Sequence, residues 1–217
     1  MSGVKLYGYF RSSAAYRARI ALNIKGVEYE TVLTDLRAPT CAHRTPQFLA
    51  LNPEGLVPVL VDGEHTITQS LAIIEYLEET HPRPPLLPRA PAERARVRAL
   101  ALAVACDIHP LDNSRVLGYL RSPLGHDEAA VNSWYAHWVA QGFTGLEEQA
   151  KRSSGDGRHM FGTEVTLADV LIVPQMYNAR RFNCDVAPYP TLRAICTHLE
   201  TLPPFARAAP QAQPDAP

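Results

Sequence analysis

The stretch VKLYGYFRSSAAYRARIALNIKG, residues 4–26, decides the fold of the first part of the chain. Its mostly apolar beginning, residues 4–10, predicts a buried strand, and residues 14–25 have helical spacing up to a stop at Gly26. A second strand is predicted at residues 29–33. Because a strand, a helix and a strand in succession form a parallel pair with a right-handed crossover, this opening predicts an α/β domain.

Further elements complete the predicted first domain. A polar segment contains a short helix near residues 46–49, and residues 57–61 and 65–68 form a β-hairpin. Ser70 is predicted to cap a helix that ends at residues 81–82, His-Pro. The order of elements is then β-α-β-α-β-β-α.

A proline-rich segment separates this domain from the rest of the chain. Residues 81–88 contain four prolines, which neither a helix nor an interior strand tolerates. We therefore predict a first domain at residues 1–81, a linker at 82–88 and an all-helical domain at 89–217. The expected helices cover residues 92–107, 116–120, 128–149 and 167–182. The last ten residues have little to bury and are expected to be loosely held or to lie across the surface.

Composition excludes several classes of function. The 21 basic and 22 acidic residues give a net charge of −1, so no global field attracts nucleic acid or an anionic membrane. The four cysteines are scattered and have no metal-ligand spacing, which predicts a reducing compartment and no metal site. No window approaches the roughly 18 apolar residues of a membrane span, and no secretion signal is visible at the start. We expect a soluble, cytoplasmic protein.

The turn at Ser12 and Ser13 is the best clue to chemistry. A small hydroxyl residue at a strand-to-helix turn lies beside exposed N–H groups and the positive end of the helix dipole, where an anion or a thiolate can be held. Simple capping of the helix explains the same residues and is the more ordinary interpretation. Serine-hydrolase chemistry has little support, because the G-x-S-x-G pattern is absent.

Two further segments are candidates for contact with a peptide-like ligand. A cis bond between Val57 and Pro58 would leave the valine backbone free to pair with a ligand, although a trans proline is the usual expectation. Gln69 and Ser70 supply an amide, a hydroxyl and a helix start that suit a carboxylate, and capping alone explains them equally well.

Arginines at three places are candidates for binding carboxylates. Arg11 is next to the first turn, Arg115 follows residues 112–114, and Arg181 precedes Phe182. A guanidinium grips a carboxylate in a bidentate fork, so arginines converging from both domains would select a substrate with carboxylates at its ends. Most surface arginines do nothing of the kind, and the pattern alone does not favour convergence.

Two patterns in the second half are interpreted as structural. Thr166 and Asp169 have the spacing of a helix capping box, with Asp in place of the usual Glu. Trp134, Tyr135 and Trp138 are at helical spacing, which is typical of core or interface positions.

Taken together, these pieces resemble the zeta class of glutathione transferases, whose best-known members are maleylacetoacetate isomerases. The matching stretches cover nearly the whole chain, and the doubled serine followed by R-x-R-I-A-L is specific to this class. They are residues 9–13, 17–22, 50–53, 57–58, 69–79, 166–169, 173–175 and 181–182. The resemblance implies a thioredoxin-like N-terminal domain, an all-α C-terminal domain, a homodimer, and glutathione as cosubstrate.

The resemblance also implies roles for individual residues. Ser12 matches the residue that activates the glutathione sulfur, with Ser13 in the same turn. The other positions implied to contact glutathione are Arg17, His43, Val57, Pro58, Gln69, Ser70, His109, Asn113, Ser114 and Arg115. Arg11 and Arg181 match arginines that meet the carboxylates of a small dicarboxylate substrate.

The implied reaction is a cis-trans isomerisation. Glutathione thiolate adds to the cis double bond of a 2-ene-4-oxo acid, rotation follows, and elimination gives the trans isomer. For maleylacetoacetate the product is fumarylacetoacetate, in the breakdown of phenylalanine and tyrosine. Maleylpyruvate is an alternative substrate. Two further alternatives are a transferase that conjugates or dehalogenates small electrophiles, and a ligand carrier that kept only the fold.

One departure from the family pattern is plain. The class has Ser-Ser-Cys followed by Ser-Trp, whereas Ala14, Ala15 and Tyr16 stand here in those last three places. Loss of the cysteine counts against a disulfide exchanger, which needs its own thiolate. An isomerase whose nucleophile is carried by glutathione is not affected, and the substitution leaves the substrate open.

Overall fold

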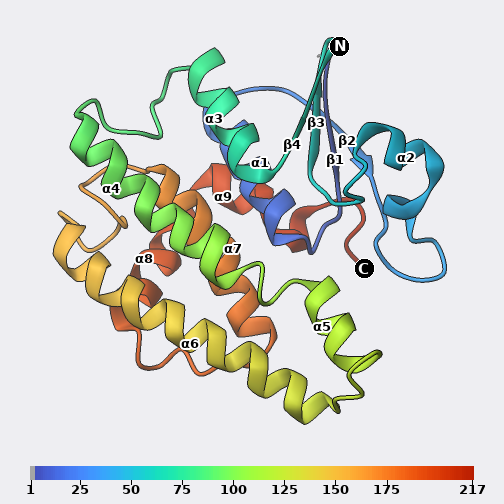
Figure 1. Cartoon of the computed structure of the whole chain (residues 1–217). Helices are drawn as coiled ribbons and strands as arrows, with labels where there is room; N and C mark the ends of the chain where they lie inside the picture. Colours follow the sequence, from blue (N-terminus) through green and yellow to red (C-terminus); the bar gives the residue numbers. More distant parts are fainter. Residues whose placement is uncertain (1–2) are drawn as a thin grey trace. The chain divides into compact units, whose positions relative to one another are not determined.

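The computed structural model describes residues 3–217, which belong to two compact units (Figure 1). The first unit runs to Pro85 and also contains Thr201–Pro217, and the second is Leu86–Glu200. The sequence analysis instead assigned residues 201–217 to the helical domain. The difference arises because the C-terminal segment packs on a helix of the first unit.

The first unit has the predicted order of elements around a four-stranded sheet. These elements are β1 (Val4–Gly8), α1 (Ser13–Lys25), β2 (Glu30–Leu33), the short 3₁₀ helix η1 (Ala42–Arg44), α2 (Pro46–Leu51), β3 (Val59–Asp62), β4 (His65–Thr68) and α3 (Ser70–Thr80). The strand order is β2-β1-β3-β4, with β1 parallel to β2 and antiparallel to β3. This is the thioredoxin-like α/β arrangement that the opening sequence predicted.

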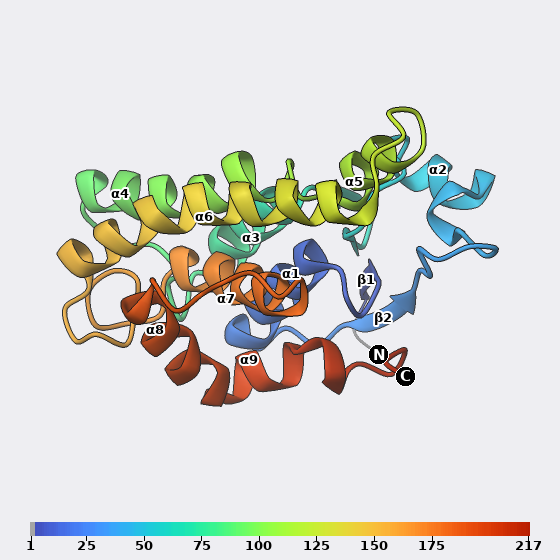
Figure 2. The same cartoon turned by 90° about the horizontal axis from the view of Figure 1, so that it is seen from below.

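Helix α1 is the centre of the first unit. It packs against α3 and against α9 (Pro203–Ala208), which lies beside it in Figure 2. Ile20, Ala21 and Leu22 are fully buried on α1, as is Leu60 on β3. The helix ends at Gly26, whose φ of 65° is the left-handed conformation that favours glycine, as predicted.

Of the two alternatives expected for the last ten residues, the loosely held tail is wrong, whereas a tail that lies across the surface fits the structure. Three hydrogen bonds fasten the segment to the first unit: Asn23 Nδ2 donates to the carbonyl of Pro204 (2.9 Å), Arg19 Nε donates to the carbonyl of Ala208 (2.9 Å), and the Phe10 N–H donates to Asp215 Oδ2 (2.9 Å). Phe205 is fully buried. Composition alone does not predict the attachment of this segment, because the attachment depends on the hydrogen-bond donors just named and on one aromatic side chain.

The second unit is helical, as predicted. It contains α4 (Pro91–Leu102), a π-helical turn η2 (Ala103–Ile108), α5 (Ser114–Arg121), α6 (Glu128–Ser153) and α7 (Leu167–Arg181). Helix α8 (Pro190–Thr201) continues to the first residue of the C-terminal segment; neither α8 nor α9 was predicted. Across residues 3–217, no helix is both long enough and apolar enough to cross a bilayer.

The predicted capping box at the start of α7 is present. Asp169 is fully buried, and its carboxylate accepts from the backbone N–H of Met160 (2.7 Å) and from both the N–H (2.7 Å) and the hydroxyl (2.9 Å) of Thr166. The box thus fixes the segment before α7 to its first turn.

Candidate functional site

The turn between β1 and α1 presents a half-buried serine at a helix start. Ser12 is the N-cap of α1: its Oγ accepts from the Ala15 N–H (3.2 Å), and its own N–H donates to the carbonyl of Tyr9 (3.0 Å). Ser13 is the first helical residue and is buried. The capping interpretation is therefore confirmed. A hydroxyl that accepts one bond can still donate its own proton, so capping leaves Ser12 able to bind an anion.

Arg11 is held in place beside this turn. Its Nη2 donates to the Tyr9 hydroxyl (3.1 Å), and its guanidinium carbon lies 5.0 Å from the centroid of the Phe10 ring. A cation over an aromatic face is attracted by the ring quadrupole, which limits the positions that the side chain adopts. A fixed positive charge therefore accompanies the Ser12 hydroxyl.

The Val57–Pro58 peptide bond is cis, so the expectation of a trans bond is wrong. Within residues 3–217, Val57 forms no hydrogen bond through its own N–H or carbonyl. The preceding loop is held by Asn52, whose Nδ2 donates to the carbonyl of Leu56 (2.8 Å) and whose Oδ1 accepts from the Glu54 N–H (3.1 Å). The Val57 backbone therefore has both donor and acceptor available to a ligand.

Gln69, rather than Ser70, is the N-cap residue of α3, which corrects the sequence prediction. Its φ of 67° is left-handed, a conformation that is strained for a residue with a side chain. Its side chain does not cap the helix, and its Nε2 donates instead to Glu54 Oε2 (2.8 Å). Ser70 is the first helical residue and is buried. Strain of this kind is found where a binding site requires it.

Two other predicted residues of the first unit differ in accessibility. His43 lies in η1 and is half-buried; burial and the nearby charge of Arg44 lower the pKa of its imidazole. Arg17, one turn after Ser13 on α1, is only 1% exposed. The Arg17 side chain is therefore buried within the first unit.

In the second unit the predicted residues lie at the start of α5. Asn113 is the N-cap of α5, and its Oδ1 accepts from the Arg115 N–H (3.1 Å). The side chains of Ser114 and Arg115 are exposed, and His109 is the residue that follows η2. Asn113 therefore sets the backbone from which Ser114 and Arg115 project.

Arg181 ends α7 on top of an aromatic stack. Its guanidinium carbon lies 4.5 Å from the centroid of the Phe182 ring. Phe182 in turn stacks on Tyr135 of α6, with ring centroids 3.8 Å apart and planes 13° apart. The interpretation of Tyr135 as a core residue is confirmed, since it is 2% exposed.

Asp112, which directly precedes Asn113, was not among the residues predicted from the sequence. It is 7% exposed, and among residues 3–217 neither of its carboxylate oxygens has a hydrogen-bond partner. Burial raises the pKa of this carboxyl to about 8. The only sequence signal was an acid directly after the apolar Leu111.

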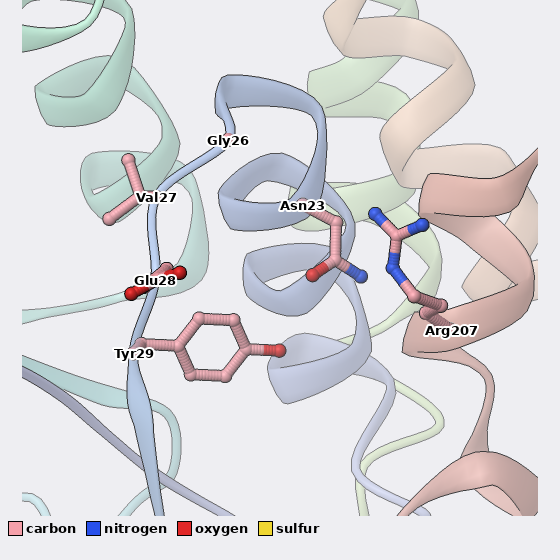
Figure 3. A pocket seen from close by; sticks show the side chains of 6 residues that line it. All are labelled: Asn23, Gly26, Val27, Glu28, Tyr29 and Arg207. Carbon is pink, nitrogen blue, oxygen red and sulfur yellow. The ribbon is translucent and has the colours of Figure 1, made fainter.

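A surface pocket in the first unit lies apart from these residues (Figure 3). Its volume is about 480 Å³, and the residues that line it are Asn23, Gly26, Val27, Glu28, Tyr29 and Arg207. In the close view the Tyr29 hydroxyl and the Arg207 guanidinium both point toward Asn23. None of the predicted site residues lines this pocket, so it is not part of the candidate site.

Comparisons with known proteins agree with this geometry. Residues 2–79 match the family described as "Glutathione S-transferase, N-terminal domain". The chain is 51% identical over 216 residues to a "Probable maleylacetoacetate isomerase" of Vibrio cholerae, covering 100% of both. It superimposes with a TM-score of 0.95 on a holo structure of maleyl pyruvate isomerase, described as a zeta-class bacterial glutathione-S-transferase, at 48% identity and covering 98% of this chain and 100% of the other.

A further solved structure shows what one relative binds. Maleylacetoacetate isomerase of Methylobacterium extorquens AM1, with bound malonate and GSH, superimposes with a TM-score of 0.93 at 43% identity, covering 98% of this chain and 99% of the other.

A thioredoxin-like unit with a helix-start serine, followed by a helical unit, defines a glutathione transferase. The chain belongs to the zeta class of that family, with the maleylacetoacetate and maleylpyruvate isomerases, and is an enzyme of that class.

Proposed function

We propose that this enzyme is a glutathione-dependent cis-trans isomerase that converts maleylacetoacetate to fumarylacetoacetate in the breakdown of phenylalanine and tyrosine. The observation that carries the proposal is the Ser12 turn, where a half-buried hydroxyl opens a helix beside the fixed cation of Arg11. Such a turn suits a bound thiolate and an anionic substrate. The full-length similarity to named isomerases supports the same reaction.

Residues of the first unit suit the groups of glutathione as the cofactor. Val57 offers an unpaired N–H and carbonyl to a peptide backbone, and the strained Gln69 with Ser70 offers an amide, a hydroxyl and a helix start to a carboxylate. The residues assigned to glutathione are Ser12, Ser13, Arg17, His43, Val57, Pro58, Gln69, Ser70, His109, Asn113, Ser114 and Arg115. When bound, glutathione supplies the thiolate that adds to the cis double bond and later leaves.

Ser12 keeps the bound sulfur ionised in this proposal. A free thiol has a pKa of ~8.5. A charge-assisted hydrogen bond worth ~1.5 to 3 kcal/mol and a helix dipole worth ~0.3 to 1 kcal/mol together lower that pKa by roughly one to three pH units. Thiolate is then the main species at neutral pH, and it is both a competent nucleophile and a good leaving group.

Arg11 and Arg181 are assigned to the substrate's carboxylates, with Arg115 as a further candidate. A guanidinium binds a carboxylate through two parallel hydrogen bonds, which fix the ends of the substrate while its central bond rotates. The malonate in the Methylobacterium relative is a dicarboxylate of the same chemical kind.

The test follows the loss of each cis acid with and without glutathione. For maleylacetoacetate we expect the trans isomer to accumulate over many turnovers with no net loss of glutathione. Stoichiometric consumption of glutathione would instead identify a conjugating or dehalogenating transferase. The second candidate substrate is maleylpyruvate, which the 48%-identical relative supports. The ratio of the two kcat/KM values decides between the substrates.

We further propose a cytoplasmic homodimer. The four cysteines are free thiols, which suits a reducing compartment. Light scattering should give a mass twice that of the 23.9 kDa chain. A mass equal to one chain would contradict the dimer.

A further inference from the structure

Asp112 is a buried acid without a partner in the second unit. It lies in the short connection between η2 and α5, and its N–H donates to the carbonyl of Ile108 (3.3 Å). The preceding carbonyl, of Leu111, accepts from Trp134 Nε1 on α6 (2.9 Å). The backbone is therefore fixed on both sides. The carboxyl group itself forms no hydrogen bond within residues 3–217, and only 7% of the residue is exposed.

Electrostatic influence and ring stacking link Asp112 to Arg181. Burial raises the pKa of both the Tyr135 phenol and the Cys184 thiol, and negative charge on Asp112 adds to both shifts, so both groups lie within range of its field. Tyr135 stacks on Phe182, and Phe182 carries the Arg181 guanidinium on its face. The charge of Arg181 partly opposes this rise in the pKa of Tyr135, which burial causes. The acid and the arginine thus act on the same phenol from two elements.

We propose that Asp112 is a positioning and specificity residue for anionic substrates: as a neutral acid it leaves the field of Arg181 to a substrate carboxylate, and as an anion it weakens that binding. This inference rests on the proposed function, in which Arg181 binds substrate.

The physical reason is the cost of a buried, unpaired charge. An ionised carboxyl with no hydrogen bonds is strongly disfavoured away from water, so Asp112 stays neutral at neutral pH. Its pKa of about 8 means that it ionises in mildly alkaline solution. The anion then opposes the field of Arg181 and must move toward water, which disturbs the ring on which Phe182 and Arg181 rest.

The other titratable groups near Asp112 do not produce the same dependence of anion binding on pH. Burial raises the pKa of the Cys184 thiol to about 11 and raises that of the Tyr135 phenol further, so both stay neutral below pH 9.5. Arginine stays protonated throughout. His109 and Arg115 flank Asp112 along the chain and are identical in every variant compared below.

The test measures malonate binding and substrate kinetics between pH 6.5 and 9.5. We expect the Kd of malonate, by calorimetry, and the KM of the cis acid to rise about threefold or more in the wild type over this range, because opposing charges at close range change affinity by such factors. In Asp112→Asn both should stay nearly constant over the same pH range. Asp107→Asn, which removes an exposed charge from η2, should behave as wild type.

The outcomes separate this inference from the proposed function. Superimposable pH profiles of wild type and Asp112→Asn, or no malonate binding in either, overturn the inference. Asp112→Ala also removes the titrating group and gives the same comparison if the Asn variant does not fold. If no cis acid is isomerised but malonate binding still loses its pH dependence in Asp112→Asn, the proposed function fails and the role of Asp112 stands.

Discussion

Two buried aspartates of the second unit have opposite surroundings. Asp169 accepts three hydrogen bonds from Met160 and Thr166, whereas Asp112 accepts none within residues 3–217. Burial raises the pKa of both carboxyls, that of Asp112 to about 8. Buried polar groups in proteins are normally bonded, so Asp169 needs only a structural explanation. The unbonded acid is the one that calls for a functional explanation.

Removing Asp169 should have the largest effect on stability. Asp169→Ala leaves two buried N–H groups and a hydroxyl without their acceptor, each costing roughly 1 to 3 kcal/mol. We expect a loss of about 3 kcal/mol or more in the free energy of unfolding, measured with urea at pH 7. The control is Asp127→Ala, which removes the exposed N-cap of α6 and should cost only about 1 kcal/mol. If Asp169→Ala loses no more free energy of unfolding than Asp127→Ala, the contrast drawn between Asp169 and Asp112 is contradicted.

Substitution of Arg181 tests whether the groups linked to Asp112 serve substrate binding. In Arg181→Ala we expect kcat/KM for the cis dicarboxylate to fall about 100-fold, equivalent to ~2.7 kcal/mol, since a charge-assisted bidentate pair is lost. The neighbouring Arg180 pairs with Glu200 on the surface (2.7 Å), and Arg180→Ala should change kcat/KM less than threefold or so. An unchanged kcat/KM in Arg181→Ala would refute the assignment.

Asp112→Asn should stabilise the protein, the opposite sign from Asp169. With a pKa raised from 3.8 to about 8, the folded acid keeps its proton while the unfolded one loses it, so wild-type stability falls as pH rises between these values. Asparagine has no such penalty. Allowing for solvent screening, we expect about 2 kcal/mol greater stability for Asp112→Asn at pH 7, shrinking as pH falls to 4. If the difference in the free energy of unfolding between Asp112→Asn and the wild type does not depend on pH, burial of the charge is not its cause.

The same contrast explains what the sequence could reveal. The capping box at Thr166 and Asp169 was predictable, because its two residues interact locally and the spacing alone defines it. The strand and helix around Ser12 were predictable for the same reason. Asp112 was not, since its burial depends on tertiary packing, such as the hydrogen bond from Trp134 to the neighbouring Leu111 carbonyl. The docking of Asp215 on Phe10 is also a long-range contact that no local pattern contains.

Ser12 is intermediate between the two aspartates and gives the smallest expected effect. Its Oγ accepts one hydrogen bond, from Ala15, and keeps a proton to donate. Ser12→Ala should therefore lose about 1 kcal/mol of stability from the cap and, separately, raise the pKa of bound glutathione's thiol by about one pH unit. Ultraviolet titration of the thiolate measures the second effect. The control, Asp127→Ala, loses a similar cap energy and should leave the thiol pKa unchanged. If the thiol pKa is the same in Ser12→Ala and in the wild type, Ser12 has only a structural role, as Asp169 does.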